Sequence, residues 1–516
     1  MMFTDPRWGE AWARLPDYLG SHMRVSIVAL ALGLIVSLPL ALASRKRPGL
    51  RAILLATASI VQTVPGLALL ALFYPLLLII SAWTLATFGV SFSAFGFLPS
   101  VLALALYSML PVLRNTVTGL NGIDPALVEA AQGVGMTERQ SLGMVELPLA
   151  MPVIMAGIRT AAVWVIGTAT LSTPIGQTSL GNYIFTGLQT QNWVSVLFGC
   201  VAAAVLAIVV DQLLALIEIG LRTRKRWETW LGTAGAALLV IAAFAPSLAR
   251  QQQAYVVGAK TFGESYVLSS LMAQRLKAAG LPARQREGLG SSVIYGALVA
   301  NELDVYVDYS GTLWANQLHR TDIKPRQEIV AELTSALKQK DGVTILGELG
   351  FENAYALVIP RKRAEDLHIK TIADLAAHSD TMSIAGDYEF FSRPEWAAMS
   401  KAYGLKFREQ RTMQPDFMYA AAGSGDVDVI AGYTSDGLIA KYDLVALEDP
   451  KQSIPPYDAI VMLSPRRAND AALQDALKSL LGKLDVTTMQ EANLRVAGSA
   501  SPDTVAQWLW EQIGKR

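Results

Sequence analysis

Long apolar runs fill the first half of the chain and end near residue 249. Windows long enough to cross about 30 Å of hydrocarbon lie at about 25–43, 52–80, 98–118, 153–172, 194–221 and 229–249. From residue 254 onward, short strand-like and helix-like patterns alternate, as in water-soluble α/β domains. With 52% hydrophobic and 17% charged residues, the chain is too apolar for a soluble protein and too charged for one held wholly in lipid. We therefore predict two domains, residues 1–250 in the membrane and residues 255–516 outside it.

Basic residues in short loops predict the orientation of the spans, because such loops stay in the cytoplasm. One basic group follows the first span and another follows the fifth: Arg45, Lys46 and Arg47, then Arg222, Arg224, Lys225 and Arg226. Both groups and the loop 119–151 share one side only if there are six spans and the N-terminus is outside. Everything after Arg250 then lies on the outer side. The region 76–97 could instead hold a re-entrant stretch or an extra span, which would break this agreement.

Several function classes find no support in the sequence. The single cysteine, Cys200, lies in an apolar span, so we expect no disulfides in the outer domain. A formal net charge of zero without a polybasic tail does not favour nucleic-acid binding. No paired nucleophile and base is apparent, so we do not expect an enzyme. No metal site is expected either, because the histidines lack metal-ligand spacing; they are His22, His319, His368 and His378.

A polar segment with two glycines, EAAQGVGMTERQSLGMVELPLAMP (129–152), lies between the third and fourth spans. Asp124 can cap a short helix that starts at Pro125. The segment resembles the coupling loop of ABC importer permeases, which implies an all-α, type I ABC importer-like membrane domain. The residues that carry the resemblance are Glu129, Ala130, Ala131, Gly133, Gly135, Leu147 and Pro148.

In that family the coupling loop docks on a separate cytoplasmic ATPase subunit. The chain has no GxxxxGK[S/T] phosphate-binding loop. We therefore expect ATP to be bound by a separate subunit and this chain to hold no cofactor. The resemblance also implies a multi-pass protein of a bacterial-type inner membrane, with a periplasmic or extracellular C-terminal domain.

The outer half shows repeated strand–helix units, which predict parallel sheets with sites at the strand ends. Its segments GAKTFGES, DVYVDYSGT, ENAYAL, EFFSRPEW, AGYTSDG and PPYDA resemble periplasmic binding proteins of the glycine betaine/choline type. The resemblance implies an α/β fold of two lobes that close on a solute. We place the first lobe at about 255–358 plus 457–516 and the second at about 359–456.

The resemblance also implies the site residues. It puts four tyrosines at turns facing the cleft: Tyr309, Tyr355, Tyr433 and Tyr457. A quaternary ammonium has no N–H, so aromatic faces must hold it, each for about 0.5–2 kcal/mol. Any one of these tyrosines could instead be an ordinary packing residue.

Lys260 and Arg393 occupy positions where the family offers cations. Choline has no carboxylate and would leave both unpaired, whereas Arg can grip the carboxylate of a zwitterion with two bonds. Alternatively, Lys260 could be an exposed turn residue, and Arg393 a surface partner of Glu389 or Glu395. Asp387 is expected near the site as well.

We therefore predict the fused permease and solute-binding subunit of an ABC transporter, which imports a glycine betaine-like quaternary ammonium solute with ATP. We expect a homodimer with two receptors over one pore. The sequence leaves open a preference for choline, carnitine or ergothioneine. More remote alternatives are a membrane-bound solute sensor, which the lack of a kinase or cyclase segment disfavours, and an enzyme acting on the outer ligand.

Overall fold

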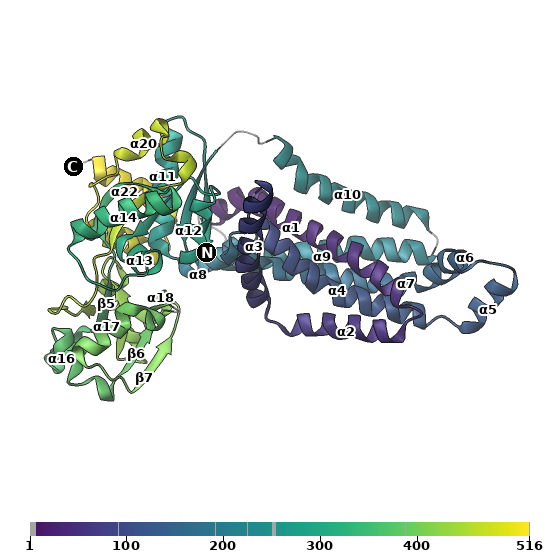
Figure 1. The fold of residues 1–516 in the computed structure, drawn as a ribbon, viewed down its shortest axis with the longest axis horizontal. Coiled ribbons are helices and arrows are strands. Elements are labelled where there is room, and N and C mark those ends of the chain that lie inside the picture. Colours follow the sequence, from purple (N-terminus) through teal and green to yellow (C-terminus); the bar gives the residue numbers. More distant parts are fainter. Residues whose placement is uncertain are drawn as a thin grey trace. The chain divides into compact units, whose positions relative to one another are not determined.

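The computed structural model describes residues 7–90, 92–190, 192–223, 225–249, 254–387 and 389–514. It separates into a helical unit, Met1–Phe185 with Val194–Gln251, and an α/β unit, Thr186–Trp193 with Gln252–Arg516 (Figure 1). The division at residues 251–252 falls beside the boundary drawn from hydropathy. The joint itself, residues 250–253, lies outside the described residues.

The helical unit contains mostly long helices. They are α1 (Arg7–Ser44), α2 (Pro48–Thr63), α3 (Gly66–Phe88), α4 (Phe97–Asn121), α5 (Pro125–Gly133), α6 (Glu138–Ser141), α7 (Leu147–Ala169), α8 (Gly181–Gln189), α9 (Trp193–Thr223) and α10 (Arg226–Ala249), with a π-helical turn at Leu142–Glu146 and a 3₁₀ turn at Thr170–Ile175. Within the described residues, six helical stretches are long and apolar enough to cross a membrane. The prediction of a six-span, all-α membrane domain is confirmed.

Helix α4 is the most buried helix of this unit and packs between α1 and α7. Glycines allow the close approach of these helices. A Cβ atom on Gly157 of α7 would lie 2.6 Å from Asn115 Cβ, and one on Gly33 of α1 would lie 1.8 Å from Ser108 Oγ. Small residues at helix crossings are typical of membrane bundles, where close van der Waals packing holds the helices together.

The second apolar window, 52–80, is not one helix. Pro65 has no N–H to donate and disfavours helical geometry at the residue before it, so Val64 is extended (φ −71°, ψ 127°) and separates α2 from α3. Figure 1 shows α3 running across the direction of α2 and α4. The hydroxyl of Tyr107 donates to the carbonyl of Val64, which satisfies a backbone group that the break would leave unpaired in lipid.

The segment between α4 and α7 begins as the sequence predicts. Asp124 Oδ1 accepts a hydrogen bond from Ala126 N (2.9 Å) and caps α5. Gly135 then turns the chain with φ +85°. The fourth span starts earlier than expected, however: helix begins at Glu138 and continues through the π-helical turn into α7, so Pro148 lies within a continuous helical stretch. The wider turn before Pro148 accommodates its ring.

The α/β unit has two mixed sheets of five strands each in its described part. The first has the order β2-β1-β3-β10-β4 and the second β7-β6-β8-β5-β9. The strands are β1 (Tyr255–Lys260), β2 (Ala283–Leu289), β3 (Val305–Tyr309), β4 (Thr344–Glu352), β5 (Tyr355–Pro360), β6 (Ser383–Gly386), β7 (Glu409–Thr412), β8 (Val429–Tyr433), β9 (Leu444–Ala446) and β10 (Asp458–Leu463).

Helices cover these sheets. They are α11 (Gly263–Ala278), α12 (Ser291–Val299), α13 (Ser310–Asn316), α14 (Arg326–Asp341), α15 (Arg361–Asp366), α16 (Ile372–Ala376), α17 (Pro394–Tyr403), α18 (Pro415–Ser424), α19 (Leu438–Lys441), α20 (Ala471–Lys478), α21 (Val486–Ala497) and α22 (Pro502–Gly514). Two sheets with their own helices form two lobes, so the predicted two-lobed α/β fold is confirmed.

The chain crosses between the lobes twice. Strand β4 of the first sheet ends at Glu352, and strand β5 of the second sheet begins at Tyr355. The first crossing therefore lies several residues before the expected position of 358. At the second crossing, Asn353 N donates to Tyr457 O (3.0 Å), which joins the two crossing segments. The strands that follow the crossings, β5 and β10, run antiparallel to their neighbours. The sheets are therefore mixed rather than parallel.

Candidate ligand-binding site

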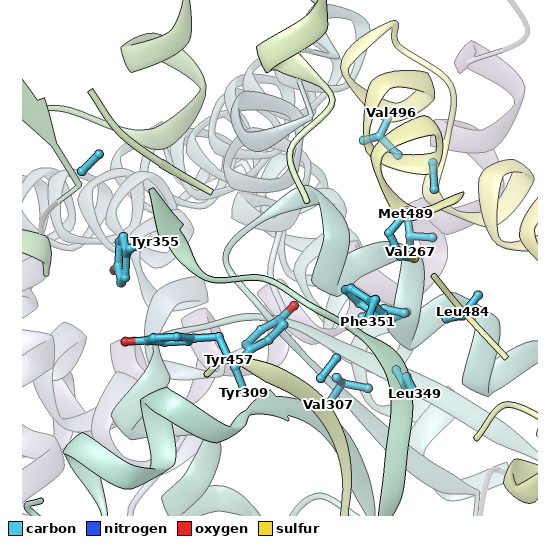
Figure 2. Packing of buried hydrophobic residues seen from close by; sticks show 14 of the residues in the cluster. Val267, Val307, Tyr309, Leu349, Phe351, Tyr355, Tyr457, Leu484, Met489 and Val496 are labelled. Carbon is cyan, nitrogen blue, oxygen red and sulfur yellow. The ribbon is translucent and has the colours of Figure 1, made fainter. Parts of the chain in front are cut away.

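Three of the predicted tyrosines come together where the two lobes meet. Tyr355, at the start of β5, pairs directly with Tyr433, at the end of β8. Their ring centroids are 5.0 Å apart, and the ring of Tyr457 stands perpendicular to that of Tyr355 at 5.9 Å. Phe390 adds a fourth ring, 5.1 Å from Tyr355. Figure 2 shows Tyr355, Tyr457 and Tyr309 on one side of the buried apolar cluster. Aromatic faces therefore surround Tyr355.

A buried carboxylate holds two of these phenols. Asp387 Oδ2 accepts hydrogen bonds from the hydroxyls of Tyr355 (3.0 Å) and Tyr433. Its other oxygen accepts from the backbone N–H of Glu389 (2.8 Å) and Phe390 (2.7 Å). Burial, together with neighbouring acidic groups, raises the pKa of Tyr355 and of Tyr433 well above its ordinary value. Both phenols are therefore neutral, with their hydroxyls bound to an anion.

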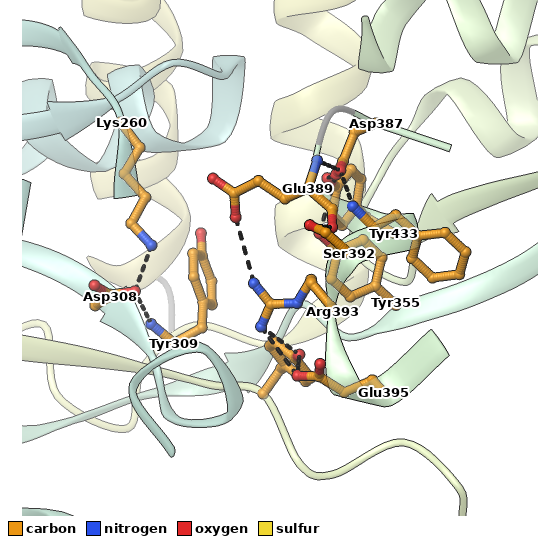
Figure 3. Close-up of polar contacts among 12 residues, drawn as sticks. Lys260, Asp308, Tyr309, Tyr355, Asp387, Glu389, Ser392, Arg393, Glu395 and Tyr433 are labelled. Carbon is orange, nitrogen blue, oxygen red and sulfur yellow. Dashed lines mark hydrogen bonds and ion pairs between the residues drawn. The ribbon is translucent and has the colours of Figure 1, made fainter. Parts of the chain in front are cut away.

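Arg393 lies against the same rings (Figure 3). Its Cζ is 5.5 Å from the centroid of Tyr355 and 6.0 Å from that of Tyr457. Its Nη2 donates to Glu395 Oε1 (3.0 Å) and to the hydroxyl of Tyr457 (3.0 Å), and its Nη1 donates to Glu389 Oε2 (3.3 Å). Arg393 is only 6% exposed, so it is not a surface residue. Its Nε is buried and has no hydrogen-bond partner among the described residues.

The fourth tyrosine belongs to a different part of the site. Tyr309, at the end of β3, has its ring beside that of Phe262, with centroids 6.1 Å apart. Its hydroxyl donates to the buried carboxylate of Glu264. Lys260 Nζ lies 5.5 Å from the centroid of the Tyr309 ring. Tyr309 is thus fixed by neighbours in the first lobe.

The expectation that Lys260 and Arg393 would stay unpaired without a ligand carboxylate is wrong for this conformation. Lys260 Nζ bonds to Asp308 Oδ1 at 2.5 Å, and Lys260 is 3% exposed, so it is not an exposed turn residue either. Asp308 also accepts from the hydroxyl of Tyr306 (2.6 Å). A buried charge needs a partner of opposite sign, and the protein supplies one here. Lys260 is therefore a weaker candidate for holding a ligand carboxylate than Arg393.

Sequence reasoning missed several polar and aromatic residues of this site. Glu264, Asn353 and Phe390 all lie within the segments GAKTFGES, ENAYAL and EFFSRPEW that pointed to the fold. They are acidic, amide and aromatic residues next to strand ends. That position is the signal by which they can be found, because sites of α/β sheets form at strand ends.

The residues of the 129–152 segment are also placed by the structure. Glu129, Ala130 and Ala131 lie on α5, with Ala131 buried and the other two exposed. Leu147 and Pro148 lie in the first turn of α7. Within the segment Val134 (76%), Met144 (66%) and Leu149 (51%) are strongly exposed, and so is Leu127 (48%) just before it. The segment therefore presents a surface that combines acidic and apolar groups.

Two sequence families match the chain. Residues 253–512 match the "Substrate binding domain of ABC-type glycine betaine transport system", and residues 29–223 match the "Binding-protein-dependent transport system inner membrane component". Ergothioneine transport permease/ergothioneine binding protein EgtU of Helicobacter pylori (strain G27) is 28% identical over 485 residues, which cover 90% of this chain and 84% of that protein.

A shorter relative matches about two fifths of the chain. Glycine betaine/carnitine/choline transport system permease protein OpuCB of Bacillus subtilis (strain 168) is 43% identical over 200 residues, 39% of this chain and 84% of that protein. A solved structure described as a glycine betaine/carnitine/choline ABC transporter is 28% identical and covers 50% of this chain and 98% of its own, with a TM-score of 0.45.

Proposed function

Because the chain belongs to the ABC-type glycine betaine transport family, with an inner-membrane permease component and a substrate-binding domain on one polypeptide, we propose that it imports a zwitterionic quaternary ammonium solute. The permease half makes it a multi-pass inner-membrane protein. The binding half is extracytoplasmic in such fusions. The proposal concerns the solute, the energy source and the assembly.

The observation that carries the proposal is the group of tyrosine rings from separate segments. Tyr355, Tyr433 and Tyr457 meet with centroids 5.0 and 5.9 Å from Tyr355. A trimethylammonium group cannot be recognised by hydrogen bonding, whereas each aromatic face contributes about 0.5–2 kcal/mol once both groups are desolvated. The phenols bonded to Asp387 direct their oxygens toward the anion. A permanent cation next to these rings is therefore favoured by the rings and by the carboxylate.

Arg393 is the group that favours a zwitterion over choline. Its Nε has no hydrogen-bond partner among the described residues, and its contact with Glu389 is long (3.3 Å) and involves a side chain that is 49% exposed. A ligand carboxylate can replace Glu389 at Nη1 with a charge-assisted hydrogen bond. Lys260 adds nothing to this argument, because Asp308 already pairs it. Glycine betaine is the simplest solute with the required groups.

Ergothioneine is a second candidate. It is a betaine of histidine, so it offers the same trimethylammonium and carboxylate groups with an additional ring. The relative from H. pylori, which covers 90% of this chain across both halves, is named for ergothioneine transport. Carnitine and choline are further outcomes that a binding experiment distinguishes.

Transport would be driven by a separate ATPase that docks on the 129–152 segment, in a homodimer with one receptor on each copy. The exposed Leu127 and Val134 beside Glu129 support a protein contact at this segment. ATP would then be bound by the partner and not by this chain. Import that continues without the partner ATPase would contradict this part of the proposal.

The test is uptake by the full chain reconstituted in vesicles with its partner ATPase. Labelled glycine betaine or ergothioneine should accumulate only with ATP inside, and titration of the full chain in lipid nanodiscs should give saturable binding. A sensor would bind solute without accumulation. Binding of choline but not of either zwitterion would overturn the role given to Arg393, and binding of no trimethylated amine would overturn the proposed function.

A further inference from the structure

One buried carboxylate outside the aromatic group is bonded from both lobes. Glu264 lies in the first turn of α11 and is 4% exposed. Its Oε1 accepts from the hydroxyl of Tyr309 and from Asn353 Nδ2 (3.2 Å). Its Oε2 accepts from Ser435 Oγ (2.6 Å) and Asn493 Nδ2 (2.7 Å). In the described part of the chain, all four partners are donors, as an ionised carboxylate requires.

The four donors come from different parts of the unit. Tyr309 ends β3 and Asn493 lies on α21, both in the first lobe. Asn353 lies on the first crossing between the lobes. Ser435 follows β8 and belongs to the second lobe. A single carboxylate therefore joins a residue beside the ligand site, the crossing and the second lobe.

Other bonds tie the loop after β8 to the first crossing and to the first lobe. Thr434 N donates to Ala354 O (2.9 Å), so the loop after β8 is tied to the first crossing. From the first lobe, Gln490 Nε2 donates to Thr434 O (2.9 Å) and Asn493 Nδ2 to Ser435 O (2.8 Å). These bonds use the backbone of the loop and do not reach the ligand site. Among the contacts described for this loop, Glu264 provides the link to Tyr309.

We propose that Glu264 is a positioning residue that couples the ring of Tyr309 to the angle between the two lobes. When the ring of Tyr309 shifts, it moves the carboxylate of Glu264 and, through it, Ser435 of the second lobe. Closure of the lobes moves the same carboxylate and therefore the ring. The proposal rests on the proposed function only in treating Tyr309 as part of the ligand site. The coupling itself requires no particular solute.

The substitution Glu264→Gln tests this arrangement with almost no change in shape. An amide has one acceptor oxygen and an NH₂ group that donates. Whichever oxygen is replaced, the new NH₂ group would face one hydroxyl, which can turn to accept, and one Asn Nδ2 donor, so one buried donor would lose its acceptor. The lobes should therefore lose their fixed angle even without ligand.

The matched control is Asp304→Asn. Asp304 is a fully buried carboxylate of the first lobe that accepts from Val256 N (2.7 Å) and pairs with Arg466 and Arg467. These partners belong to the first lobe, so this variant removes a buried charge without touching the lobe boundary. A second test variant, Ser435→Ala, keeps Glu264 and removes only the donor from the second lobe.

The measurement is the distance between spin labels on Lys277→Cys and Lys401→Cys, one exposed helix position in each lobe, in the full chain in nanodiscs with Cys200→Ala. Without ligand, Glu264→Gln should broaden the distance distribution and Ser435→Ala should broaden it less, whereas Asp304→Asn should match the parent. With glycine betaine or ergothioneine added, the midpoint of closure should rise about tenfold in Glu264→Gln, equal to 1.4 kcal/mol.

An unchanged distribution in Glu264→Gln overturns the proposal, and so does equal broadening in Asp304→Asn. If Glu264→Gln does not fold, Ser435→Ala decides, because an unchanged distribution in that variant also overturns it. The ligand-free distances separate this inference from the proposed function. Broadening by Glu264→Gln in a protein that binds neither zwitterion would retain the coupling and reject the solute assignment.

Discussion

Gly311 lies directly against the ring of Tyr457, and a Cβ atom on residue 311 would be 2.5 Å from Tyr457 Cε2. Gly311 is in the first turn of α13, just after Tyr309, whereas Tyr457 lies on the second crossing between the lobes. The backbone of one segment therefore determines how close a ring from the other segment can lie. At this distance a methyl group must displace the ring.

The first prediction is that Gly311→Ala weakens solute binding about tenfold, the loss of roughly one aromatic contact. The displaced ring of Tyr457 would no longer be perpendicular to that of Tyr355. Titration of the full chain with glycine betaine measures the effect. Gly290→Ala is the control, because nothing lies within 4 Å of a Cβ atom there. Equal affinities for parent and Gly311→Ala would exclude Tyr457 from the site.

The second prediction separates the ring of Tyr433 from its hydroxyl. Tyr433→Leu removes the aromatic face and should weaken binding of a quaternary ammonium by about 0.5–2 kcal/mol. Tyr433→Phe retains the face and loses only the bond to Asp387, so its affinity should stay closer to that of the parent. Equilibrium dialysis with labelled solute measures both. Similar losses in the two variants would show that the hydroxyl, not the ring, contributes the binding energy.

The third prediction assigns different roles to the two cations. Arg393→Met should weaken glycine betaine binding at least tenfold and choline binding much less, because only glycine betaine has a carboxylate that can bind Arg393. Lys260→Met should instead lower stability by about 3–5 kcal/mol, the cost of leaving Asp308 buried without its partner. Binding titrations and thermal melting of the full chain measure these effects. Equal loss for both solutes in Arg393→Met would contradict the carboxylate contact.

The fourth prediction concerns a charged group inside the helical unit. Arg159 of α7 binds Asp211 of α9 through Nε and Nη2, both at 2.9 Å, and binds Glu218 through Nη1 at 2.8 Å. Charged side chains within membrane spans are stable only when paired. Arg159→Met should therefore reduce the fraction of protein that stays monodisperse on heating, and Asp211→Asn with Glu218→Gln should restore part of it. Arg222→Met, at an exposed position near the end of α9, is the control. If the double change restores nothing, the lower stability of Arg159→Met does not come from leaving Asp211 and Glu218 unpaired.

Much of the fold is predictable because it depends on local properties of the sequence. Crossing a membrane needs a long apolar window, and Asp124 before Pro125 is enough to predict the capped start of α5. The break at Pro65 is not among the predictions, since the window 52–80 is counted as one span, although a proline inside such a window is a signal for a break. The direction of α3 after the break depends on packing against α4 and the 3₁₀ turn at Thr170–Ile175, which involves residues far away in the sequence.

The site was less predictable, because its charges are paired by residues from distant segments. Lys260 and Asp308 are neighbours because β1 and β3 are adjacent strands, 48 residues apart along the chain. Glu264 meets Asn493 at a separation of 229 residues. The tyrosines were predicted from turns that resemble those of a known family, but whether a cation has a partner depends on how strands and lobes are assembled.

Helix α10 has a consequence for the supply of receptor. The match to the membrane family ends at residue 223, and α10 (Arg226–Ala249) then leads to β1 within a few residues. Synthesis of one polypeptide therefore yields one receptor for each permease, and the ratio is the same at every expression level. Any change in the expression of this chain therefore changes the number of capture sites and the number of permease halves in equal proportion.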